Sequence, residues 1–90
     1  MERVYLTRAG YERLIEELEH LKQVKRKEIS AAIEHARSLG DLKENAEYHA
    51  AKDAMAKSET RVLELEDKLS RVEIIDGIIV IAIKLILVQS

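Results

Sequence analysis

The sequence predicts an all-α protein: a long antiparallel α-helical coiled-coil hairpin with a short, β-prone, apolar C-terminal tail. The first observation is composition, because 36% of the 90 residues are charged and 47% are hydrophobic, with no Phe, Trp or Pro. An aliphatic core mixed with so much charge is typical of long helices and coiled coils. The second is a pair of apolar stripes at helical spacing, and the third is the glycine that separates them, Gly40.

Charge and cysteine content exclude several classes of function. The formal net charge is -2, so nonspecific attraction to phosphate is not the main binding force. Cysteine is absent, which excludes disulfides, a thiol nucleophile and zinc sites built on thiolates. Residues 1–6 contain no long apolar stretch of the kind that marks a secretory signal. We therefore expect a cytoplasmic protein.

The first arm is predicted over residues 7–39. Thr7 is placed to cap the helix N-terminus, and Leu6 and Tyr11 are spaced for a hydrophobic staple. Lys25 and Glu28 occupy positions where a strict heptad requires apolar residues, so we expect a local phase slip that does not end the helix. The stripe on either side of the slip consists of Tyr11, Leu14, Leu18 and Leu21, then Ile29, Ile33 (or Ala32), Ala36 and Leu39.

The second arm is predicted over residues 41–72, after Gly40 has ended the first arm as a left-handed cap. Asp41 and Glu44 lie three residues apart, which predicts a capping box at its start. Because each stripe is the nearest cover for the other, the arms fold back into a rod of about 45–50 Å with its tip at residues 38–45. The stripe of this arm consists of Tyr48, Ala51, Met55, Ser58, Val62, Leu65, Leu69 and Val72.

Residues 74–90 form a tail that differs in kind from the hairpin of residues 1–73. Only Asp76 and Lys84 are charged in it, and the β-branched run after Gly77 favours a strand over a helix. The run is too short to cross a bilayer as a helix. Such a strand needs a partner, which we expect in a missing domain or in another copy of the chain. Self-association through this tail is therefore predicted.

The tip carries the most informative pair of residues. Asp41 and Glu44 share one face of a helical first turn, where acidic residues also serve simply to cap a helix. The functional alternative is that the two carboxylates bind a cation at the end of a thin rod. Mg²⁺ requires about six oxygen ligands, so two carboxylates alone do not hold it tightly. A metal site here would need its remaining ligands from a partner macromolecule.

Other candidates carry a weaker signal. The histidines lack metal-site spacing and are expected on the surface: His20, His35 and His49. The basic run on the shaft is expected to be a solvated face that pairs with nearby Glu: Lys22, Lys25, Arg26 and Lys27. Cations near the tip are candidates for phosphate contact: Arg37, Lys43 and Lys52. Tyr48 is expected to pack at the end of the stripe, with stacking on a nucleotide base as the alternative. The sequence contains no phosphate loop and no catalytic triad pattern, so no enzyme activity of its own is expected.

Residues 40–52, GDLKENAEYHAAK, closely resemble the tip of the bacterial Gre transcript cleavage factors, GreA-like members in particular. Residues 5–18 and 24–29 are similar to the first helix of that family. The resemblance covers about residues 3–75, which corresponds to the N-terminal coiled-coil domain. The coiled-coil regulators of the same polymerase channel that contain zinc are excluded, because their cysteines are absent here.

The resemblance implies a transcription elongation factor that enters the secondary channel of bacterial RNA polymerase. There it would stimulate the polymerase's intrinsic cleavage of backtracked nascent RNA near the 3′ end. Asp41 and Glu44 would help position the attacking water and a Mg²⁺ ion that is shared only in the complex. Arg37 and Lys52 match a small basic patch that touches the extruded RNA. The resemblance also implies an association with DNA, no membrane, and no cofactor of its own.

Two alternatives to cleavage stimulation stay open at this point. One is an inhibitory Gre homologue that occupies the channel without promoting cleavage. The other is a plain coiled-coil interaction module in which the acidic pair only caps a helix. A complete Gre factor continues into a C-terminal globular domain, so the tail at 74–90 is expected to be the remnant or the start of that missing domain.

Overall fold

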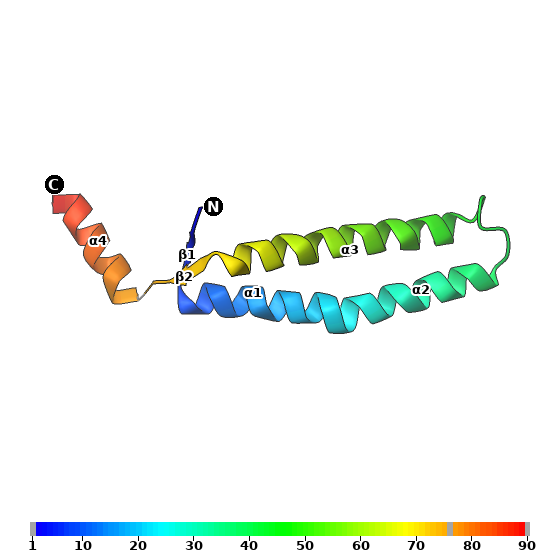
Figure 1. Cartoon of the computed structure of the whole chain (residues 1–90), viewed down its shortest axis with the longest axis horizontal. Coiled ribbons are helices and arrows are strands. Elements are labelled where there is room, and N and C mark those ends of the chain that lie inside the picture. Colours follow the sequence, from blue (N-terminus) through cyan, green and yellow to red (C-terminus); the bar gives the residue numbers. More distant parts are fainter. Residues whose placement is uncertain (1, 76, 90) are drawn as a thin grey trace.

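The computed structural model describes residues 2–75 and 77–89, so positions 1, 76 and 90 of the predicted hairpin and tail lie outside the described residues. It shows a thin antiparallel helical hairpin with one further helix projecting from its base (Figure 1). The molecule measures 67 Å along its longest axis and 22 and 20 Å along the other two. The predicted all-α hairpin is confirmed.

The first arm consists of α1 (Arg8–His20), a π-helical turn η1 (Leu21–Lys25) and α2 (Arg26–Ser38). Thr7 caps α1 as predicted, since its Oγ1 accepts a hydrogen bond from the Gly10 amide at 3.1 Å. A π-helical turn fits one extra residue into a helix and so rotates the side chains that follow it. It lies where the apolar stripe changes phase, and it accounts for the predicted slip without a break in the arm.

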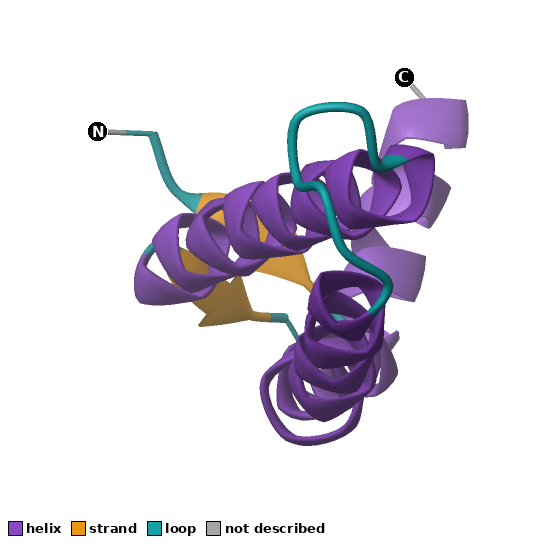
Figure 2. Cartoon of the chain, turned by 90° about the vertical axis from the view of Figure 1, so that its right-hand side faces the viewer, coloured by secondary structure: helices purple, strands orange, loops and turns teal. Residues whose placement is uncertain are grey.

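The second arm is a single helix, α3 (Ala46–Ser70), which returns along the first arm. Seen from the tip, the two arms lie side by side and cross at an angle (Figure 2). The buried residues of α3 all belong to the predicted stripe: Ala51, Ser58, Val62 and Leu65. The buried residues of the first arm all lie in α2: Ile29, Ile33 and Ala36. The stripe residues of α1 are only half-buried, so the core is most complete along α3 and the half of the first arm nearest the tip.

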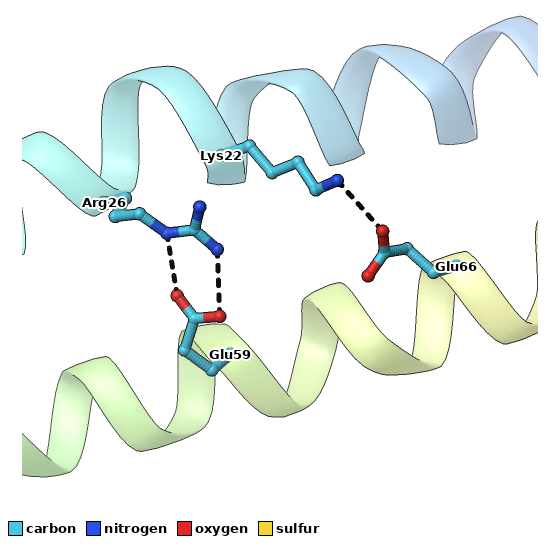
Figure 3. A network of polar contacts seen from close by, with 4 residues as sticks. All are labelled: Lys22, Arg26, Glu59 and Glu66. Atoms are coloured by element: carbon cyan, nitrogen blue, oxygen red, sulfur yellow. Dashed lines mark hydrogen bonds and ion pairs between the residues drawn. The ribbon is translucent and has the colours of Figure 1, made fainter.

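Ion pairs tie the two arms together in the middle of the shaft. The Arg26 guanidinium donates two parallel hydrogen bonds of 2.9 Å to the Glu59 carboxylate, and Lys22 Nζ lies 2.9 Å from a Glu66 carboxylate oxygen (Figure 3). All four side chains are more than two-fifths exposed, so each pair stabilises the fold only modestly. The predicted pairing of the basic run with nearby Glu is confirmed for these two cations.

A third cross-arm pair joins α1 to α3. Arg61 donates hydrogen bonds of 2.7 and 3.0 Å to the two carboxylate oxygens of Glu17. These hydrogen bonds hold the pKa of Glu17 below its ordinary value, against a smaller opposing effect of burial. Together with the other two pairs, this contact ties the first arm to α3 at three points along the shaft.

The base of the hairpin is closed by two short parallel strands that the sequence did not predict. Residues Val4–Leu6 (β1) pair in register with Val72–Ile74 (β2). Val72, expected as the last stripe residue of the second helix, therefore lies in a strand beyond the end of α3. Arg71 reinforces the closure, because its guanidinium donates to the Glu2 carbonyl at 2.7 Å and to an Asp67 carboxylate at 2.8 Å.

The apolar tail is a helix, α4 (Gly77–Gln89), and the predicted strand is wrong. A lone strand leaves its backbone amides and carbonyls without partners, whereas a helix satisfies most of them within its own segment. Ala82 and the lysine and leucines that follow it also favour a helix. Among the described residues, no helix combines the length and the apolar character needed to cross a membrane.

Candidate functional site at the hairpin tip

The tip is a short loop between the end of α2 and the start of α3. The Leu39 amide donates to the Ala36 carbonyl at 3.1 Å, and the Gly40 amide donates to the Arg37 carbonyl at 3.3 Å. Gly40 has a φ of +111°, a backbone conformation that strains any residue with a side chain. The predicted glycine cap is confirmed, while Leu39 ends the helix as a 56% exposed residue and not as a buried member of the stripe.

Asn45, and not Asp41, caps the second arm, so the predicted capping box is wrong. The Asn45 Oδ1 accepts a hydrogen bond from the Tyr48 amide at 3.0 Å. Asp41 instead makes a local contact within the loop, where its Oδ1 accepts a hydrogen bond from the Lys43 amide at 3.0 Å. An aspartate side chain can accept from a nearby amide in a turn as well as from an amide at a helix start. Here Asp41 makes the turn contact, with the amide two residues further along the chain, and not a helix cap. The helix begins at Ala46, beyond Glu44.

Further hydrogen bonds fix the loop between the two arms. The Asn45 amide group donates to the Ala36 carbonyl at 2.6 Å, which joins the start of α3 to the end of α2. A ring nitrogen of His49 lies 2.8 Å from the Lys43 carbonyl. The loop therefore has a defined shape that does not depend on the carboxylate of Glu44.

Three acidic residues surround one shallow hollow on the loop: Asp41, Glu44 and Glu47, together with Leu39, Asn45 and Ala46. All three acids are exposed. In the part of the chain that the structure describes, the Glu44 carboxylate has no hydrogen bond or ion pair, and Glu47 lies 3.9 Å from His35. Sequence reasoning missed Glu47, although its position three residues after Glu44 was a signal for it.

The acidic residues do not form a complete metal site. Over residues 2–75 and 77–89, no group of three or more His, Cys, Asp or Glu side chains is arranged to hold a metal ion. Exposed carboxylate oxygens are the ligand type that Mg²⁺ prefers, so Asp41 and Glu44 fit the ion in type but not in number. This donor set can contribute to a Mg²⁺ site but cannot enclose the ion.

A second hollow lies between α2 and α3 beside the tip. Arg37 and Lys52 both line it, with Tyr48 and Met55 and with three residues of α2, Ser30, Ile33 and Glu34. The Arg37 guanidinium donates to the Glu34 carboxylate at 3.3 Å. The structure thus brings the two predicted phosphate-contact residues to one surface, next to the acidic loop but separate from it.

Tyr48 packs as predicted at the end of the stripe. It lies half-buried against the core cluster of Ile29, Ile33 and Ala51. Lys52 Nζ stands 5.4 Å from its ring centroid, a cation–π arrangement, and the His49 ring meets it edge-on at 5.7 Å. Because the core, a lysine and a histidine already surround the ring, packing accounts for Tyr48.

Comparison with known proteins bears directly on this tip. The family described as "Transcription elongation factor, N-terminal", which is that of GreA and GreB, matches residues 4–74. The chain belongs to this family. The match includes both arms, the acidic loop and both short strands. It ends at Ile74, the last residue of β2, and leaves α4 outside.

Individual relatives agree with the family match. The transcription elongation factor GreA of Methylobacterium sp. (strain 4-46) is 59% identical over 76 residues, which cover 84% of this chain and 48% of that protein. The GreA of Xanthomonas axonopodis pv. citri (strain 306) is 57% identical over 74 residues, or 82% of this chain and 47% of that protein. The chain spans about half the length of the curated relatives that it matches.

Proposed function

We propose that this chain acts as a Gre-type transcription elongation factor on bacterial RNA polymerase. In this proposal the hairpin enters the polymerase secondary channel, tip first, and stimulates the polymerase's intrinsic cleavage of backtracked RNA. Membership of the family and the name "Transcription elongation factor GreA" of its relatives support it. The chain has no catalytic step of its own, because the cleavage reaction belongs to the polymerase.

One observation carries the role of the acidic pair. Asn45 caps α3, so neither Asp41 nor Glu44 is needed to start that helix. Both carboxylates are exposed on a loop at one end of a rod only about 20 Å wide. This argues against the alternative in which the acids serve only as a helix cap. It supports a role for them toward a partner.

The acidic and the basic residues near the tip would have different roles. Mg²⁺, when bound, supplies charge stabilisation for the attacking and leaving oxygens of a phosphodiester. Asp41 and Glu44 would offer carboxylate oxygens to complete a coordination shell whose other ligands belong to the polymerase, and would orient the attacking water. Arg37 and Lys52 would contact phosphates of the extruded RNA from the neighbouring hollow. The exposed loop can approach these groups without unfolding either arm.

The direct experiment is RNA cleavage in stalled, backtracked elongation complexes with the whole chain added. We expect Asp41→Asn and Glu44→Gln to lower the stimulated rate by at least about 10–100-fold, the loss that removing even an outer-shell residue of a metal site commonly causes. The matched controls are Asp53→Asn and Glu64→Gln, which remove exposed carboxylates from the shaft. Equal stimulation by tip and shaft variants would refute the proposal.

The same assay separates the two alternatives. An inhibitory homologue would slow cleavage by a complete Gre factor, and its tip variants would compete as well as the unaltered chain. A plain interaction module would have no Mg²⁺-dependent effect on transcription at all. Either outcome would replace the proposed function.

A further inference from the structure

Helix α4 is the one described helix without a polar face. Its residues 81–89 are all exposed, and the large apolar side chains among them range from 51% exposed for Ile83 to 84% for Val88. Lys84 is its only charged residue. A helix that is apolar on all sides belongs in the interior of an assembly. In the isolated chain, residues 81–89 of this helix lie against solvent instead.

A lipid bilayer is a poor match for this surface. The 13 residues of α4 make a helix of about 20 Å, which is shorter than the roughly 30 Å hydrocarbon core of a membrane. A helix that lies in the membrane surface has one strongly polar, usually basic face. A single lysine does not supply such a face.

We propose that α4 is an assembly helix that packs against the α4 helices of other copies of this chain. The accessible surface of the molecule is 6984 Å², whereas a compact monomer of 10.3 kDa exposes about 5,400 Å². The difference is about twice the roughly 800 Å² that each partner buries in a standard protein interface. The slender arms account for part of it, but α4 is the part whose surface is almost entirely apolar.

The position of Lys84 defines the face that meets the other copies. Successive residues of a helix are turned by about 100°, so Ala82 and Ile86 lie on the side opposite Lys84, and Val88 lies on the same side as the lysine. Packing through the Ala82–Ile86 side leaves the lysine in water. Two helices of this length cover only one side of each other, so the all-round apolar surface favours a bundle of more than two α4 helices.

The place of α4 in the molecule suits this role. It projects from the base of the hairpin, at the opposite end from the acidic loop (Figure 1). A bundle of α4 helices would therefore gather the bases and leave every tip free. The assembly is independent of the proposed function, because its surface shares no residue with the tip.

The test is sedimentation equilibrium of the whole chain over a range of concentrations. We expect species larger than a dimer, with the average mass falling toward 10.3 kDa on dilution. Ile86→Glu should shift the chain to monomer, whereas Val88→Glu, on the side of Lys84, should leave most of the association intact. A monomer throughout, a species that stops at dimer, or equal effects of the two variants would overturn the proposal.

Two further measurements keep the result interpretable. Circular dichroism should show that Ile86→Glu keeps the helical hairpin, whose buried residues all lie in α2 and α3. Co-sedimentation with phosphatidylcholine vesicles tests whether a lipid bilayer, and not another copy of the chain, covers the apolar surface of α4. Binding to vesicles that dissolves the oligomer would identify lipid as the partner of α4 and would also overturn the proposal.

Discussion

The two ends of the rod differ in the contacts that hold them together and in the polarity of their surfaces. The tip is a loop held by hydrogen bonds in which Asn45 and Asp41 take part, and its acidic side chains are exposed. The base is held by paired strands and continues into an apolar helix with one charge. The difference teaches that one hairpin can present two unlike surfaces, an acidic one and an apolar one, at its two ends.

Breaking the shaft should have the largest effect, because both ends depend on it. Leu65 is fully buried in α3, so Leu65→Ala should lower the free energy of unfolding by about 2–5 kcal/mol. Leu63 lies two residues away and is 67% exposed, and Leu63→Ala should change it by less than about 0.5 kcal/mol. Urea unfolding followed by circular dichroism measures both. Similar losses in the two variants would mean that the described core is not the one that holds the arms together.

Removing the cap at the tip should have an intermediate effect and should separate folding from chemistry. Asn45→Ala loses the hydrogen bond from the Tyr48 amide and the hydrogen bond to the Ala36 carbonyl. We expect the free energy of unfolding, measured by thermal unfolding, to fall by about 1 kcal/mol. Asn45→Asp keeps the acceptor for Tyr48 and should recover part of that loss. Asp41→Asn should leave stability nearly unchanged. A larger loss from Asp41→Asn than from Asn45→Ala would restore the capping role to the acidic pair.

The smallest effect is expected at the Glu17–Arg61 pair, on the shaft between the two ends. Its hydrogen bonds lower the pKa of Glu17, so the folded state favours the ionised carboxylate. The resulting stabilisation is present above the ordinary carboxyl pKa of about 4.3 and is lost as the pH falls through the lower folded value. Glu17→Gln should remove this contribution, so the variant should be slightly less stable near pH 7 and equally stable below the folded pKa; the loss is small because both side chains are partly exposed. If the free energy of unfolding fell as much on acidification in Glu17→Gln as in the unaltered chain, the pair would contribute nothing.

The arms were predictable because side-chain periodicity reports directly on burial. The positions that the structure buries in α3, Ala51, Ser58, Val62 and Leu65, are all members of the predicted stripe. The phase slip was visible in Lys25, and the π-helical turn Leu21–Lys25 is its physical form. The family resemblance seen in residues 40–52 is confirmed by the match over residues 4–74.

The remaining features could not be predicted because they depend on contacts between residues that are distant in the sequence, which a local pattern does not reveal. Asp41 and Asn45 are both good N-cap residues, and the choice between them depends on the Asn45 contact with Ala36, nine residues back along the chain. The pairing of β1 with β2 joins two segments that are adjacent at the base but far apart in the sequence. In the tail, β-branched composition favours a strand, but no partner strand is present among the described residues, and the helix satisfies its own backbone.

The central claim is that Asp41 and Glu44 act on a metal ion which the chain cannot hold alone. The most direct test is a Mg²⁺ titration of RNA cleavage by backtracked polymerase, with and without the chain. We predict that the chain lowers the Mg²⁺ concentration needed for half-maximal cleavage and that Glu44→Gln abolishes this shift while Asp53→Asn preserves it. A Mg²⁺ requirement that is the same with the chain, with Glu44→Gln and with no chain at all would contradict the account.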